Sequence, residues 1–99
     1  MVIKADRRLY RVKYDDILYV VGQQEYVTFH TMQRNITALY SLKDLMEELP
    51  QGLFLRIHRS FIVSLKHVEF VDTANVTVAG SELPIGPSYR DDVMKTLGM

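Results

Sequence analysis

The residue types best suited to chemistry stand together in one basic stretch, FLRIHRSFIVSLKH, which covers residues 54–67. Positions 56–60 hold two arginines, a histidine and a serine, and no acidic residue occurs between Glu48 and Glu69. An arginine guanidinium presents a planar fork of donors, so it can bind a phosphate or a guanine edge through two parallel hydrogen bonds. The stretch therefore predicts a surface that contacts phosphate groups or guanine bases.

The two arginines of this stretch have different surroundings. Apolar residues typical of strands flank them, and a strand buries its apolar face, so the charged side chains must leave at a strand end or a bend. Two interpretations stay open for Arg56: contact with a ligand, or an ion pair with an acid on a strand that holds two sheets together. Arg59 lies in the irregular middle of the stretch, which favours a functional role.

Catalytic and metal-binding constellations are missing from the sequence. The three histidines, His30, His58 and His67, fall in different segments, and none has a carboxylate at a recognisable spacing. No G-x-S-x-G elbow, H-E-x-x-H pair or glycine-rich loop ending in Gly-Lys occurs. Cysteine is absent, which excludes thiolate zinc sites and a disulfide framework. The sequence therefore predicts no enzyme, no cofactor and no metal site.

The overall composition bounds the function further. The 12 Lys and Arg residues match the 12 Asp and Glu residues, and the sequence pI is about 6.8. Nucleic-acid-binding domains are usually more basic, so such a function must depend on local charge. The 99 residues suit one domain. Neither a membrane-spanning run nor a signal peptide is recognisable, which is compatible with a cytoplasmic protein that has no membrane partner.

The elements that must position the basic stretch are mostly short strands. In EYVTFHT, residues 25–31, strand-prone residues alternate, with Tyr26, Thr28 and His30 on one face. Further strands are expected at residues 9–14, 16–22, 34–40, 54–58, 61–64, 68–73, 76–80 and 82–86, with a hairpin loop at 22–24 and Pro84 marking an edge strand.

Two segments instead repeat their apolar residues at helical spacing. Residues 41–50 predict a short amphipathic helix that covers a sheet, with Ser41 as its N-cap. Residues 87–97 predict a terminal helix with Ser88 as its cap. One apolar stripe of that helix contains Tyr89, Val93 and Leu97. From the residues alone, short strands with one or two helices favour a compact β-sandwich or barrel.

The basic stretch FLRIHRSFIVS resembles the signature of the LytTR family of bacterial DNA-binding domains, in which an R-x-H-x-S core lies between apolar flanks. The resemblance covers essentially the whole chain in the right order. DDILYVVGQQEYVTFHT is similar to the early hairpin of the family, SLKDLMEELP to its internal helix, LPIGPSYRDDVMKTL to its closing segment, and VIKADRRLYRVKYDD to the start of the domain in response regulators of Bacteroidetes type.

The resemblance implies both a fold and a biological setting. The implied fold is mainly β, an elongated arrangement of small antiparallel β-sheets with one short internal helix and a C-terminal helix, and residues 1–99 form a single LytTR-type domain. The implied function is sequence-specific binding of double-stranded DNA by loops in successive major grooves, as the cytoplasmic output domain of a two-component response regulator. The receiver domain of such a regulator is absent from this sequence, so Met1 is expected to begin a fragment of a longer chain. Dimerisation through that receiver on repeated half-sites is expected to supply avidity.

The resemblance also implies which residues contact DNA. The expected contacts are Gln23, Gln24 and Glu25 leading into Tyr26 (the hairpin segment, residues 23–26), His58, Arg59 and Ser60 (the junction segment), and Ser88, Tyr89 and Arg90 (the helix-entry segment), with Lys66 and Lys95 as additional candidates. The arginines suit guanine, Gln24 suits adenine, and the serines and His58 suit phosphate. Glu25 could accept from cytosine N4 or point away from the DNA.

Two other functions compete with DNA binding. A protein-interaction module without nucleic-acid binding, using an exposed edge strand or an apolar patch, is favoured by the neutral net charge. Binding of single-stranded RNA by stacking would use Tyr19, Tyr26, Phe29 and Tyr40, but aromatic residues that alternate on strands usually pack a core.

Overall fold

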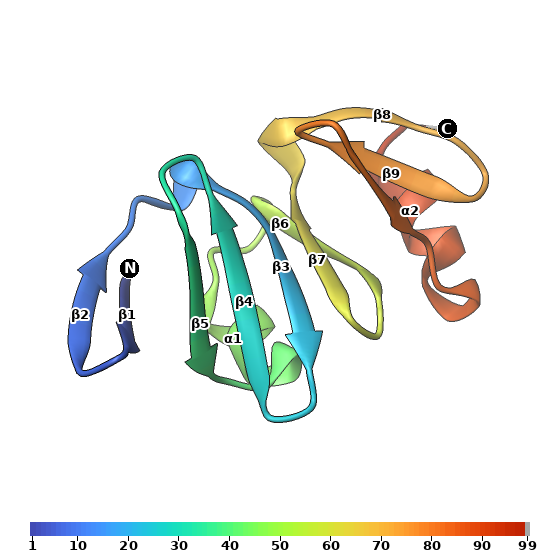
Figure 1. The fold of residues 1–99 in the computed structure, drawn as a ribbon. Helices are drawn as coiled ribbons and strands as arrows, with labels where there is room; N and C mark the ends of the chain where they lie inside the picture. The colour runs from blue at the N-terminus through green and yellow to red at the C-terminus, as the bar shows by residue number, and fades with distance from the viewer. Residues whose placement is uncertain (99) are drawn as a thin grey trace.

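Three antiparallel sheets stand side by side along an elongated molecule in the computed structural model, which describes residues 1–98 (Figure 1). The principal extents are 41 × 24 × 22 Å. The elements are β1 (Val2–Ala5), β2 (Arg8–Arg11), η1 (Tyr14–Asp16), β3 (Ile17–Gln23), β4 (Tyr26–Thr31), β5 (Asn35–Leu39), α1 (Leu42–Glu48), β6 (Phe54–His58), β7 (Phe61–Ser64), η2 (Leu65–His67), β8 (Val68–Val71), β9 (Asn75–Val78), β10 (Ser81–Pro84), η3 (Pro87–Tyr89) and α2 (Arg90–Thr96).

The sheets contain two, five and three strands, in the orders β1-β2, β5-β4-β3-β7-β6 and β10-β9-β8. This confirms the elongated arrangement of small sheets with two helices that the family resemblance implies. The compact sandwich or barrel expected from strand spacing alone is wrong. Most strands pair with their neighbours in the chain, which leaves the sheets small and open (Figure 1).

The five-stranded sheet separates two hydrophobic cores. Successive side chains of a strand point to opposite faces, so Ile62 of β7 packs into the first core and Val63 into the second. Helix α1 covers the first core with Leu42 and Leu45, and the backbone amide of Asp44 donates to the Ser41 hydroxyl at 3.0 Å. The predicted cap and the predicted role of this helix are therefore confirmed.

The terminal helix packs on the second core but begins later than predicted. Tyr89, Val93 and Leu97 all contact that core, which confirms the stripe. Residues 87–89 form a 3-10 turn, and α2 itself begins at Arg90. Ser88 lies within this turn and caps nothing, so the predicted cap is wrong. Because α2 begins at Arg90, its N-cap position falls on Tyr89 and not on Ser88.

Two other boundaries differ from the sequence predictions because strand pairing decides where a strand ends. The strand expected at residues 9–14 is β2, which ends at Arg11 opposite Val2, where its partner β1 begins. The hairpin loop expected at 22–24 lies at residues 24–25, since Gly22 and Gln23 still pair with β4. Pro84 lies in β10, an edge strand of the three-stranded sheet, as predicted.

Polar contacts join η1 to η2, and β3 of the five-stranded sheet to β10 of the three-stranded sheet. The His67 Nε2 atom and the Asp15 carbonyl oxygen lie 2.6 Å apart, and Lys66 forms an ion pair of 3.2 Å with the Asp15 carboxylate. The Tyr19 hydroxyl donates to Ser81 on β10 at 3.5 Å. Within residues 1–98, no helix has the length and apolar character needed to cross a membrane.

Candidate nucleic-acid interface

The hairpin, junction and helix-entry segments lie along one edge of the molecule. Strands β3 and β7 are antiparallel neighbours, so the end of β3 and the start of β7 meet at the same end of the sheet. The Gly22 amide, directly before the hairpin segment, donates to the Ser60 carbonyl of the junction segment at 2.8 Å. In Figure 1 the β3–β4 turn, the β6–β7 turn and the chain entering α2 all lie toward the lower edge.

The hairpin segment contains the turn that joins β3 to β4. Gln24 and Glu25 form its two-residue turn, and Gln24 has a φ of +57°, a left-handed conformation that non-glycine residues adopt mostly in turns. The side chains of Gln23, Gln24 and Glu25 are exposed, and Tyr26 is 49% exposed. The segment therefore presents amide, carboxylate and phenol groups to solvent with few internal partners.

The junction segment is a tight turn that follows an irregularity in β6. The register shifts between Arg56 and His58, and a turn at Arg59 and Ser60 leads into β7. The Ser60 amide donates to Nδ1 of His58 at 3.0 Å. Because Nδ1 accepts, the neutral ring carries its proton on Nε2, which can donate to an external oxygen. Arg59 is exposed at the tip of the turn.

Arg56 turns back toward this junction. Its Nη2 donates to the Arg59 carbonyl at 2.7 Å, and its Nε donates to the His58 carbonyl at 3.3 Å. The ion pair with a strand-borne acid that the sequence suggested for Arg56 is wrong: among residues 1–98, Lys66–Asp15 is the only ion pair. The guanidinium instead binds backbone carbonyls of the junction, a structural contact of a different kind from the expected ion pair.

The helix-entry segment is packed against the junction. The Gly86 amide donates to the Ile57 carbonyl at 2.8 Å, and the Tyr89 amide donates to the Gly86 carbonyl at 2.9 Å. A Cβ atom at Gly86 would lie 3.0 Å from the Tyr89 ring and 3.4 Å from the His58 Cα, so a side chain has little room there. Ser88 and Arg90 are exposed, whereas Tyr89 is half-buried against the second core.

A groove of about 280 Å³ lies between the hairpin and junction segments. Its lining includes Gln24, Tyr26, Lys43, Arg56, Arg59 and Ser60. Lys43 was not among the predicted contacts, although it is exposed in the first turn of α1. The sequence alone cannot show that Lys43 lines this groove, because the position of Lys43 depends on α1 packing beside the β3–β4 hairpin.

The structure does not bring the two additional lysines to this groove. Lys66 lies in η2, which follows β7, whereas Ser60 directly precedes β7, so the two residues are at opposite ends of this strand. The Lys66 ammonium pairs with the Asp15 carboxylate. Lys95 is exposed on α2, five residues after Arg90, so the two side chains point about 140° apart around the helix. The residues of the three segments therefore lie along one edge, and Lys66 and Lys95 are less well placed to contact DNA there.

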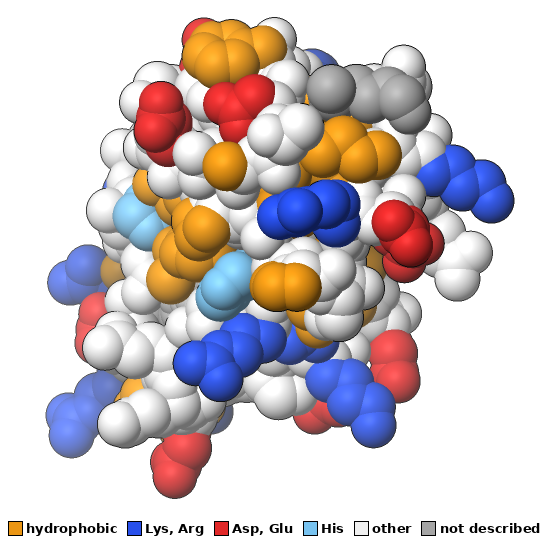
Figure 2. Space-filling view, turned by 90° about the vertical axis from the view of Figure 1, so that its right-hand side faces the viewer, with side chains coloured by type: hydrophobic (Ala, Val, Ile, Leu, Met, Phe, Trp, Pro, Cys, Tyr) orange, Lys and Arg blue, Asp and Glu red, His pale blue; other side chains and the backbone are white. Residues whose placement is uncertain are grey.

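Charged side chains are unevenly distributed on the face of the molecule next to the helix-entry segment. Figure 2 views the side of the molecule that carries α2 and the three-stranded sheet. Lys and Arg side chains gather over its middle and lower parts around histidine and hydrophobic groups, while most acidic side chains lie at its top and margins. A balanced net charge thus leaves a locally basic area.

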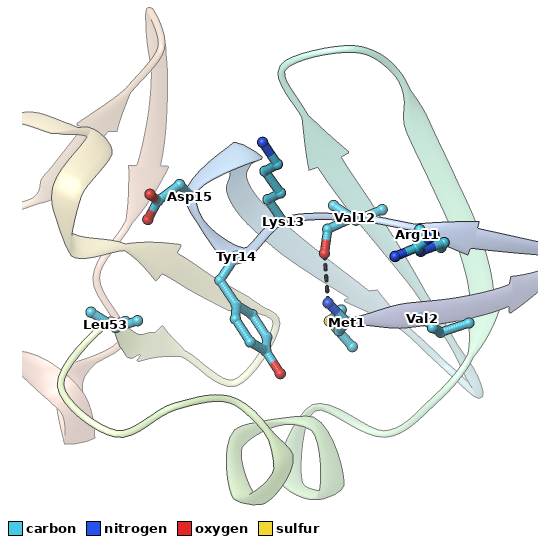
Figure 3. Close-up of a pocket in the computed structure, with 8 residues that line it drawn as sticks. All are labelled: Met1, Val2, Arg11, Val12, Lys13, Tyr14, Asp15 and Leu53. Carbon is cyan, nitrogen blue, oxygen red and sulfur yellow. Dashed lines mark hydrogen bonds between the residues drawn. The ribbon is translucent and has the colours of Figure 1, made fainter.

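Two alternative surfaces are less suited to nucleic acid. Phe29 is fully buried and Tyr19 stacks on His30 at 4.3 Å between ring centroids, so neither ring is free to stack on RNA bases. A hollow of about 830 Å³ beside the N-terminus has a lining of apolar and charged side chains, Val2, Leu53 and Lys13 among them (Figure 3). The Met1 ammonium donates to the Val12 carbonyl at 2.6 Å there. None of the predicted DNA contacts lines it.

The chain is similar to known proteins over nearly its whole length. The family model described as LytTr DNA-binding domain matches residues 7–98. The Sensory transduction protein LytT of Bacillus cereus is 30% identical over 98% of this chain and 42% of its own length. The Transcriptional regulatory protein LytR of Staphylococcus aureus is 22% identical over the same shares of the two chains. The chain thus spans about two fifths of these relatives.

A solved structure shares the fold. The LytTr DNA-binding domain of a Bacillus cereus protein, described as a methyl-accepting/DNA response regulator, superposes with a TM-score of 0.86. It is 24% identical and the match covers 100% of this chain and 96% of the solved one. With the family model matching nearly every residue, the conclusion is direct: this chain belongs to the LytTr DNA-binding domain family.

Proposed function

We propose that this domain binds double-stranded DNA sequence-specifically through the hairpin, junction and helix-entry segments. One observation carries the proposal: three segments far apart in the chain meet along one edge, with Arg59 and Arg90 exposed on it. An exposed arginine can bind guanine O6 and N7 through two hydrogen bonds, and the neighbouring hydroxyl groups suit phosphate. The proposed role is binding, with no catalytic step.

The three segments lie next to one another: the Gly22 amide donates to the Ser60 carbonyl and the Gly86 amide donates to the Ile57 carbonyl, each at 2.8 Å. They can therefore form one continuous contact surface. The proposed entry of these loops into successive major grooves on one face of the duplex rests on the family resemblance. The small sheets then act as a rigid frame, and no helix needs to enter the groove.

The wider setting is also a proposal. The relatives are named as sensory transduction and transcriptional regulatory proteins and are more than twice as long as this chain. This supports an output domain of a cytoplasmic two-component response regulator, with a receiver supplying dimerisation on repeated half-sites. Two linked domains would gain affinity through effective concentration, which a neutral single domain needs.

Selection from a random pool of duplexes, followed by fluorescence anisotropy, tests the proposal. Arg59→Ala and Arg90→Ala are each expected to weaken binding to the selected duplex by roughly 1–3 kcal/mol per lost base contact. Arg34→Ala is the matched control, because Arg34 lies in the loop before β5 with its guanidinium against the Tyr10 ring at 5.6 Å. Affinity should fall with salt with a log–log slope of about −0.9 per neutralised phosphate.

The outcomes separate the competing functions. Unchanged affinity in both edge variants would refute the assignment of the interface. No enrichment of any duplex motif, together with no salt-dependent binding, would favour the protein-interaction module instead.

A further inference from the structure

Arg56 lies where the three segments meet. We propose that Arg56 is a positioning residue: its guanidinium holds the junction and helix-entry segments in the arrangement that binds DNA, without contacting a base itself. The inference rests on the proposed function and deepens it, because it concerns how the same edge is organised before DNA arrives.

The first part of this role is the hold on the junction. Nη2 and Nε of Arg56 donate to the carbonyls of two successive residues, Arg59 at 2.7 Å and His58 at 3.3 Å. The His58 carbonyl lies at the end of β6, just after the register shift, and the Arg59 carbonyl lies in the turn that follows, outside the strand pairing. A donor that carries a charge forms stronger hydrogen bonds than a neutral one, which makes the guanidinium an effective clamp on this turn.

The second part is the contact with the helix-entry segment. The guanidinium carbon of Arg56 lies 5.8 Å from the centroid of the Tyr89 ring, within the range of a cation–π contact. Arg56 also lines the groove that Gln24 and Arg59 share. One planar group therefore reaches the junction and Tyr89 at once and borders the hairpin segment.

The chemistry of this arrangement is specific to arginine. A lysine ammonium keeps the charge but has no planar fork to reach two carbonyls and no flat face to lie against an aromatic ring. No acid pairs with Arg56 among residues 1–98, so the residue is not accounted for as half of a salt bridge. The hydrogen bonds of Arg56 to two backbone carbonyls and its contact with the Tyr89 ring are therefore the interactions that fix its position.

The test compares Arg56→Lys and Arg56→Met with Arg34→Lys, a control that alters the same kind of arginine–tyrosine contact elsewhere. Without DNA, NMR hydrogen exchange should be roughly tenfold faster at the Ser60, Gly86 and Tyr89 amides in both Arg56 variants and unchanged in the control. Such a change corresponds to about 1.4 kcal/mol in local opening.

DNA binding supplies the second readout. Arg56→Lys is expected to lose roughly tenfold in affinity for the selected duplex, about 1.4 kcal/mol, while its affinity for an unrelated duplex and its salt slope stay as in the wild type. A phosphate contact predicts the opposite pattern: lysine would restore binding, and Arg56→Met would reduce the slope by about 0.9.

Each result decides the matter. Wild-type affinity in Arg56→Lys, a reduced slope in Arg56→Met, or unchanged amide exchange in either variant overturns the proposal. If Arg56→Met unfolds, as its urea midpoint would show, Arg56→Lys decides alone. If the wild type binds no duplex but the exchange rates change, DNA binding is refuted while the hold of Arg56 on the two segments stands.

Discussion

Replacing Gly22 with alanine perturbs the packing of β3 against α1, directly before the hairpin segment. The added Cβ would lie 2.8 Å from Cδ1 and 2.9 Å from Cγ of Leu42. Carbon atoms pack best at about 3.5–4.0 Å, so the new methyl group overlaps Leu42 by roughly 0.6–0.7 Å. Leu42 is 6% exposed and belongs to the first core, so a shift of its side chain would disturb the packing of its core neighbours.

Two opposing effects set the magnitude of this change. Overpacking a filled core costs about 1–3 kcal/mol of unfolding free energy. Alanine also restricts the unfolded chain, which returns about 0.4–1 kcal/mol. Gly22 lies within an extended strand, so alanine suits its backbone and adds no conformational penalty. We expect a net loss of about 1–2 kcal/mol.

A double-mutant cycle with Leu42→Ala isolates the cause. Leu42→Ala alone should cost roughly 2–5 kcal/mol, because it leaves a cavity beneath the sheet. In the double variant the alanine methyl at position 22 enters that cavity, so the total loss should be smaller than the sum of the single losses by at least about 0.5 kcal/mol. Urea unfolding followed by far-UV circular dichroism measures all four free energies.

Additive losses would refute the packing between Gly22 and Leu42, as would a Gly22→Ala variant as stable as the wild type. A change in the urea m-value would instead show that the substitutions altered the denatured state, and thermal unfolding would then serve as a second measure.

The other predictions concern stability and use the same urea assay. The hydrogen bond to Glu48 raises the pKa of Tyr40 from 10.0 to about 12, so this bond stabilises the fold fully below pH 10 and the stabilisation disappears as the pH rises through 12. Tyr40→Phe should therefore have a lower unfolding free energy at pH 8, and that free energy should fall less between pH 10 and pH 12 than in the wild type. Ser41→Ala removes the cap of α1 and should cost about 0.5–2 kcal/mol, whereas Ser41→Asn should retain most of it. Burial lowers the pKa of His30 below 6.5, so the unfolded chain takes up the proton first and stability falls as the pH drops through 6.5; His30→Gln should lack that component when pH 7.5 and pH 5.5 are compared.

Several features of the domain could be read from local sequence. The alternation in EYVTFHT identifies the buried face of β4, since strand side chains alternate whatever lies around them. Ser41 and the apolar spacing behind it identify α1 for a similar reason, because capping involves residues only three positions apart. The order of strands and helices, together with the R-x-H-x-S core, was sufficient to indicate the family.

The arrangement of the interface depends on contacts between distant residues. Arg56 and Tyr89 lie 33 positions apart (89 − 56), and no local pattern predicts that their side chains meet. The same holds for Lys43, which reaches the groove only because α1 packs beside the hairpin. Ser88 shows the reverse case: it is a possible cap by residue type, but the chain forms a 3-10 turn there and the Gly86 amide bonds to Ile57 of β6. The individual DNA contacts stay predictions. The sequence by itself determined which residue types are available for binding, because type and spacing are local properties. Only the tertiary structure decided how the three segments are held next to one another and that Arg56 faces inward to join them, because strand pairing and core packing bring distant segments together.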